Sequence, residues 1–130
     1  MSLNGILLFA HGARDSAWAQ PFEAATALLR QRLAAQGEGT QVRLAFLEFM
    51  TPSLREAGTD LAACGCQQVT IVPLFLGAGG HVRKDLPALM SDLSSQYPAV
   101  EWRLSRAVGE TDLLIQALAD SAWSLAHPEQ

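Results

Sequence analysis

The sequence lacks long apolar runs, an excess of basic residues and a framework of cysteines, and each absence excludes a class of protein. No stretch approaches the roughly 20 apolar residues that a membrane-spanning helix needs. Nine Lys and Arg stand against 13 Asp and Glu, for a formal net charge of −4, so a nucleic-acid-binding face is not expected. The two cysteines, Cys64 and Cys66, are one residue apart, and this spacing favours free thiols over a disulfide or a metal site.

Common nucleotide-binding and nucleophile motifs are also absent. Residues 77–80 read G-A-G-G, but Val82 occupies the position of the third glycine in G-x-G-x-x-G. Neither a P-loop nor a G-x-S-x-G elbow occurs. The first apolar run, residues 3–10, is too short for a signal peptide and lacks a basic flank and a cleavage site. We therefore expect a cytoplasmic protein.

The chain does have enough apolar residues for one core. It has 130 residues, of which 49% are hydrophobic and 17% charged. This composition predicts a single globular domain over residues 1–130, with its core at about residues 4–126. A chain of this length buries about two thirds of the surface that its unfolded form exposes.

Apolar runs and helical stripes alternate along the chain. Strands are expected at residues 6–10, 41–47, 69–76 and 100–104, and a helix is expected after each. Thr51, Asp85 and Thr111 are the expected caps of the last three helices, with prolines in or near the first turns of the first three. The side chains expected to face inward in the first and last helices are Phe22, Ala25, Thr26, Leu29, Leu33, Leu114, Ala117, Leu118, Ala122 and Leu125.

Four strand–helix units in succession predict an α/β fold. Such units form a parallel sheet with helices on both faces, and right-handed crossovers leave few strand orders open. We expect a flavodoxin-like, four-stranded sheet in the order 2-1-3-4.

Two histidines and a carboxylate follow the first three predicted strands. His11 follows the first strand, Glu48 the second, and His81 the glycine-rich loop after the third. Ligands of open α/β sheets bind beyond the carboxyl ends of the strands, where the strand order reverses. In the order 2-1-3 these residues would share one edge, as a ligand set suited to divalent Fe, Co, Ni or Zn.

Each of these residues also has a structural interpretation. His11 would then bond a backbone carbonyl in its loop, and Glu48 would face the positive end of the following helix. No packing reason explains an imidazole at His81, which favours a functional role there. Among the basic residues, Arg14, Arg83, Lys84 and Arg106 fall near the predicted site and would either hold a carboxylate-rich ligand or remain solvated.

Three segments resemble the class II chelatases, in particular short CbiX-like proteins. Residues 7–15 (L-L-F-A-H-G-A-R-D) resemble the family's L-x-x-H-G-S-R-D, with Ala13 in place of the common serine. Residues 45–54 resemble A-F-L-E…P-S-L. Residues 72–87 resemble V-P-L-F-L…G-G-H-V…D-I-P. The resemblance runs from about Gly5 to Leu118.

The resemblance implies ATP-independent insertion of Co²⁺ or Fe²⁺, and possibly Ni²⁺, into sirohydrochlorin, in siroheme- or cobalamin-type biosynthesis. The metal would be a substrate, with no permanent cofactor, and His11, His81 and Glu48 would bind it and act in catalysis. A homodimer is also implied, because longer relatives carry two such domains. The residues implied in binding the tetrapyrrole are Arg14, Gly79, Gly80, Arg83 and Lys84.

Two other functions stay open. A non-catalytic carrier of metal or tetrapyrrole would need the same residues. A histidine phosphatase would also place His-Gly after a strand, but its nucleophilic histidine follows an arginine, and here Ala10 precedes His11.

Overall fold

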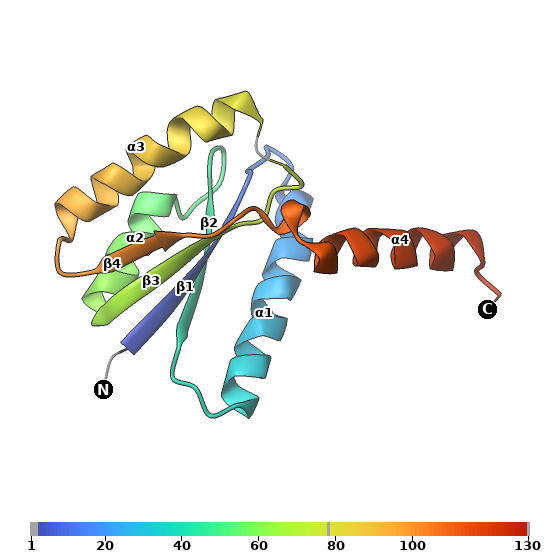
Figure 1. The fold of residues 1–130 in the computed structure, drawn as a ribbon, viewed down its shortest axis with the longest axis horizontal. Helices are drawn as coiled ribbons and strands as arrows, with labels where there is room; N and C mark the ends of the chain where they lie inside the picture. Colours follow the sequence, from blue (N-terminus) through green and yellow to red (C-terminus); the bar gives the residue numbers. More distant parts are fainter. Residues whose placement is uncertain (1–2, 78, 130) are drawn as a thin grey trace.

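The structure, a computed structural model, describes residues 3–77 and 79–129, and the side chains of residues 80–83 lie outside this description. A parallel sheet in the order β2-β1-β3-β4 forms its centre, which confirms the predicted fold class and strand order (Figure 1). The strands are β1 (Leu3–Ala10), β2 (Gln41–Phe46), β3 (Cys66–Pro73) and β4 (Glu101–Leu104).

Helices cover both faces of the sheet unequally (Figure 1). On one face lies α1 (Gln20–Ala35), preceded by the short helix η1 (Ser16–Ala19). On the other face lie α2 (Leu54–Ala63) and α3 (Gly80–Gln96). After β4, η2 (Val108–Glu110) leads into α4 (Asp112–Ala126), which stands away from the body. None of the helices in the described part of the chain has the length and apolar character that crossing a bilayer requires.

The larger part of the core lies between the sheet and α2 and α3. Leu7 and Phe9 of β1 and Ile71 of β3 are fully buried there. The α1 face holds two smaller clusters, one around Leu8 and one around Ala10. Apolar side chains facing α2 and α3 are therefore better covered than those facing α1.

The third strand was predicted three residues too late. Its ladder with β1 starts at Cys66 and ends where Pro73 pairs with Phe9, not at Leu76. The apolar run continues beyond the ladder because Phe75, only 2% exposed, is buried as part of the following loop. Burial of a loop residue thus produced the same apolar pattern as a strand.

The predicted cap of α2 was also wrong. Helix α2 begins at Leu54, and its N-cap is Ser53 rather than Thr51. The Ser53 hydroxyl accepts a hydrogen bond from the Glu56 backbone N–H at 3.1 Å, while the Glu56 carboxylate accepts one from the Ser53 N–H at 2.8 Å. This reciprocal capping box satisfies two backbone donors that a helix otherwise leaves unpaired.

Replacing Ser53 by alanine should lower the free energy of unfolding by about 1 kcal/mol, because the Glu56 N–H loses its acceptor. Urea denaturation followed by circular dichroism would measure this loss. Thr51→Ala is the matched control and should leave the midpoint nearly unchanged. A larger effect at Thr51 than at Ser53 would contradict the assignment of the cap.

Helix α3 begins five residues before the predicted Asp85 cap. Its N-cap is Gly79 and its first residue is Gly80, so Pro87 lies inside the helix rather than in its first turn. An acidic residue followed by proline resembles a helix start, but here the helix is already under way. His81 therefore belongs to the first turn of α3 and not to the preceding loop.

The inward-facing side of the last predicted helix is not buried in this chain. Ala117, Leu118, Ala122 and Leu125 are exposed, and Leu114 is only half-buried. Ala25 of α1 is likewise exposed, although the other members of the α1 stripe face inward. The amphipathic pattern of α4 was correct, but its partner lies outside the described chain.

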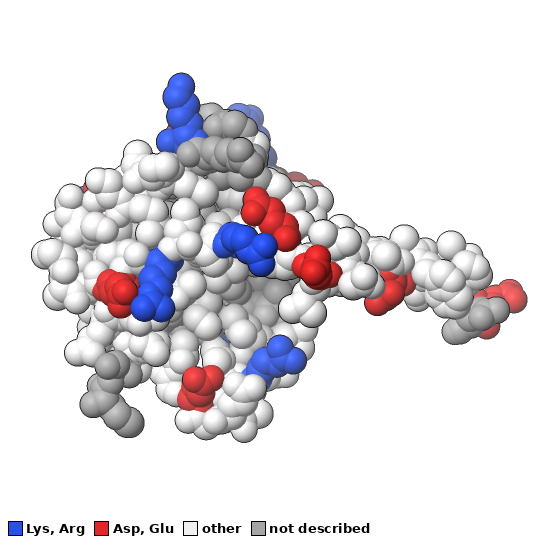
Figure 2. All heavy atoms as spheres, viewed as in Figure 1, with Lys and Arg blue, Asp and Glu red and all other residues white. Residues whose placement is uncertain are grey.

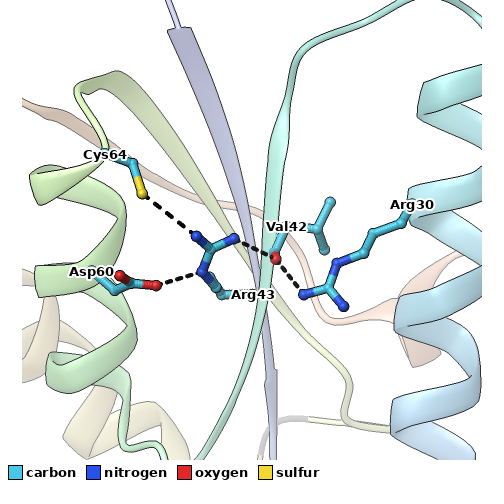
Figure 3. A network of polar contacts seen from close by, with 5 residues as sticks. All are labelled: Arg30, Val42, Arg43, Asp60 and Cys64. Atoms are coloured by element: carbon cyan, nitrogen blue, oxygen red, sulfur yellow. Dashed lines mark hydrogen bonds and ion pairs between the residues drawn. The ribbon is translucent and has the colours of Figure 1, made fainter.

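Two arginines close the outer edge of β2 (Figure 3). The Val42 carbonyl accepts hydrogen bonds from Arg30 at 2.7 Å and from Arg43 at 3.0 Å. Arg43 also pairs with Asp60 and donates to the Cys64 thiol at 3.5 Å. Both cysteines are free, as expected, and burial, followed by the nearby Cys64, raises the pKa of the Cys66 thiol. A raised pKa keeps Cys66 as a protonated, unreactive thiol at neutral pH.

Candidate functional site

The loops after β1, β2 and β3 meet at one edge of the sheet, as the strand order predicts (Figure 1). The Leu47 N–H donates to the Ala10 carbonyl at 2.9 Å, and the Leu74 N–H donates to the Phe9 carbonyl at 2.7 Å. These bonds hold the chain beyond β2 and β3 against the end of β1. His11, the residue after β1, therefore occupies the centre of this edge.

Gly12 brings the first two loops into direct contact. A Cβ atom at this position would lie 1.5 Å from the Glu48 carbonyl oxygen. No side chain fits there, so the glycine lets the backbone after His11 pass against the backbone of Glu48. The structure thus places His11 and Glu48 on touching loops, and the Glu48 side chain is exposed.

The His11 ring rests on the buried core. Its centroid lies 4.3 Å from that of Phe75, with the two rings inclined at 36°. The backbone of His11 is fixed as well, because its carbonyl accepts a hydrogen bond from the Trp18 indole at 2.7 Å. The ring is only half-buried, so one side stays open to a ligand while Phe75 supports the other.

An apolar cleft of about 440 Å³ opens beside His11. It runs between the start of α1 and the chain that follows β3. The Gly109 N–H donates to the Phe75 carbonyl at 2.9 Å, which ties the segment before α4 to the same loop. The lining residues are His11, Trp18, Phe22, Leu74, Phe75, Leu76 and Gly77.

Large apolar side chains at this edge were missed in the sequence analysis. Trp18 is 44% exposed, Phe49 60% and Leu76 69%. Phe49 has a positive φ of 67°, a conformation that costs energy in a non-glycine residue and recurs at functional sites. The Arg14 guanidinium lies 5.1 Å from the centre of the Phe49 ring. The available signal was position, because each apolar residue lies in or near a loop that follows a predicted strand.

The other predicted site residues fall into two groups. Arg14, Glu48, Gly79, Lys84 and Arg106 are exposed, and Gly79 lies just before α3. The side chains of Gly80, His81 and Arg83 lie outside the described residues, although their backbone forms the first turn of α3.

No group of three His, Cys, Asp or Glu among the described side chains is placed to hold a metal ion. This search does not extend to the His81 ring. The combination of His11, His81 and Glu48 therefore stays a prediction. What the structure supports is the meeting of the loops that carry His11 and Glu48.

Comparison with known sequences identifies relatives of the whole fold. The CbiX family profile matches residues 5–124. A sirohydrochlorin cobaltochelatase of Sulfurisphaera tokodaii is 27% identical over 116 residues, which cover 89% of this chain and 88% of that protein. Another, of Saccharolobus solfataricus, is 33% identical over 86 residues, which cover 66% of this chain but only 62% of that protein.

Solved structures agree with this assignment. A CbiX protein of Marinobacter aquaeolei superposes with a TM-score of 0.80 at 30% identity, covering 97% of this chain and 99% of that one. SirB of Bacillus subtilis with Fe³⁺ gives a TM-score of 0.73 at 26% identity, covering 92% of this chain and 46% of that one. A cobalt complex of the sirohydrochlorin chelatase SirB, at 23% identity and a TM-score of 0.76, shares the fold. With its profile match over residues 5–124, the chain belongs to the CbiX family.

Proposed function

We propose that this protein inserts Co²⁺ or Fe²⁺, with Ni²⁺ as a third candidate, into sirohydrochlorin without ATP, in siroheme- or cobalamin-type biosynthesis. The observation that carries the proposal is His11, held half-open at the mouth of an apolar cleft where the strand ends meet. Family membership supports it, because curated relatives are named sirohydrochlorin cobaltochelatase. Association of two copies is part of the same proposal.

Metal insertion makes two demands that imidazoles meet. Two pyrrole N–H protons must leave the macrocycle, and water must leave the metal ion. Neutral His11 and His81 would ligate the incoming ion and accept the protons, because imidazole titrates near neutral pH. Glu48, on the loop that touches Gly12, would complete the ligand set or relay a proton. The ion is a substrate, so few ligands and an open site serve turnover better than a closed cage.

The surroundings of His11 fit a flat, carboxylate-rich macrocycle. Trp18, Phe49 and Leu76 offer exposed apolar surface for its face, and aromatic side chains bury large areas of this kind. Arg14, placed over Phe49, would pair with a carboxylate at the macrocycle edge. The remaining residues proposed to contact the substrate are Gly79, Gly80, Arg83 and Lys84.

An absorption assay under anaerobic conditions tests the proposal. Sirohydrochlorin is mixed with Co²⁺, Fe²⁺ or Ni²⁺ with and without protein, and the change in the macrocycle spectrum is followed. The protein should accelerate the change for at least one metal with repeated turnover. A bound but unchanged macrocycle, with no acceleration over the spontaneous rate, would instead indicate a carrier.

Replacing Arg14 by glutamine should raise the KM for sirohydrochlorin about 10-fold with little change in kcat, because one charge-assisted contact to a carboxylate is lost. Initial rates over a range of sirohydrochlorin concentrations would separate the two constants. Arg32→Gln is the matched control, since Arg32 is an exposed arginine in the last turn of α1. An equal rise in KM for both variants would remove Arg14 from the proposed binding surface.

A further inference from the structure

Helix α4 exposes an apolar face that nothing in the described chain covers. Leu113, Ile115, Leu118, Trp123 and Leu125 are between 51% and 86% exposed. The helix extends from the body to the C-terminus without returning to the sheet (Figure 1). An isolated helix of 15 residues is marginal in water, and most helices depend on packing of an apolar face. This face therefore calls for a partner.

The apolar residues of α4 form a seam suited to packing against another surface. Ile115, Leu118, Ala122 and Leu125 are spaced by three, four and three residues, the spacing that keeps side chains on one helix face. The opposite stripe is polar and is made of Asp112, Gln116, Asp120 and Ser124. Leu113 lies away from the seam, so it serves as an internal comparison on the same helix.

Charge separates the end of the chain from the body. Residues 1–106 carry nine acidic and nine basic residues, whereas residues 107–130 carry four acidic and no basic residues. Figure 2 shows acidic but no basic side chains on the visible face of the projecting helix. Two α4 helices packed directly on each other would place like charges together. The body, which holds all the arginines, is the more favourable surface.

The body also lacks a helix where one is needed. On the α1 side of the sheet, α1 packs mainly on β2, and Thr70 and Val72 of β3 are only half-buried. Their neighbours Val69 and Ile71, which face α2 and α3, are fully buried. Among the described residues, the α1 face of β3 and β4 therefore forms an uncovered strip, which begins near the end of the cleft at Leu74.

We propose that α4 of each protomer packs on the uncovered strip of a second copy, so that two copies exchange their last helices. A chain that carries both a surplus helix and an unfilled place for it closes by twofold exchange, since each copy supplies what the other lacks. The tight passage of Gly109, where a Cβ would lie 1.8 Å from the Leu76 carbonyl, fixes the segment before α4 and directs the helix away from its own sheet. The proposal rests on association of two copies but not on the proposed chemistry.

Sedimentation velocity of the full chain tests the exchange. The wild type should have twice the mass of one 14.0 kDa chain, and Leu118→Asp should have the mass of a single chain. Leu113→Asp introduces the same charge on the same helix outside the seam and should stay dimeric. Thr70→Asp, on the receiving strip, should also give single chains, and circular dichroism verifies that each variant is folded.

The outcomes separate the exchange from the association itself. A single-chain mass for the wild type would contradict the association of two copies, whatever the insertion assay shows. A dimer that withstands both Leu118→Asp and Thr70→Asp would retain the association but overturn the exchange of α4. Dissociation by Leu113→Asp as readily as by Leu118→Asp would overturn the assignment of the seam.

Discussion

Replacing His11 by alanine is expected to lower the rate of metal insertion into sirohydrochlorin by at least about 100-fold, because a positioned general base contributes at least that factor. The variant also loses one proposed metal ligand. Its fold should be unchanged, since the half-buried ring lies on the outer side of Phe75. The absorption assay measures the rate, and circular dichroism verifies the fold.

His127→Ala is the control for this experiment. His127 is an exposed residue at the end of α4, where its ring contacts Trp123, so its removal should leave the insertion rate unchanged. His81→Ala should lower the rate as much as His11→Ala. Near-normal rates in both the His11 and the His81 variants would end the chelatase interpretation, even if the protein binds the tetrapyrrole.

Replacing Gly12 by alanine is expected to damage stability and activity together. The added Cβ would meet the Glu48 carbonyl oxygen at 1.5 Å, and backbone cannot rotate away as a side chain would. Overpacking of this kind typically costs about 1–3 kcal/mol, and we expect a loss at the upper end. The loop carrying His11 must shift, and a displacement of about 1 Å can lower a rate by roughly 100-fold.

Urea denaturation and the insertion assay would measure the two effects of Gly12→Ala. Gly39→Ala is the matched control, because nothing lies within 4 Å of its added Cβ. A Gly12 variant as stable and active as the Gly39 variant would show that the loops after β1 and β2 do not need their close contact.

The fold could be predicted because the relevant signals are local. Alternating apolar runs and amphipathic stripes define a parallel sheet, and crossover handedness restricts its order. The same order placed His11 and Glu48 at one edge. Their contact through Gly12 was not predictable, because it depends on the distance between two loops rather than on either segment alone.

The errors arose where tertiary structure outweighs a local signal. Asp85 and Pro87 resemble a helix start, yet α3 begins at Gly80, which moves His81 from a loop into a helix. The stripe of α4 was recognised, but a stripe does not specify which surface it packs on. Phe49 escaped notice because only the backbone shows that it is turned outward, at a positive φ.

The most direct test of the central claim is a Co²⁺ titration of the protein without tetrapyrrole, followed by the visible absorption of bound cobalt. If His11 and His81 bind one ion, each single alanine variant should weaken binding severely, and the double variant should be little worse than either, because contacts to a shared ligand are not additive. Independent, additive losses, or unchanged binding in both single variants, would contradict the account.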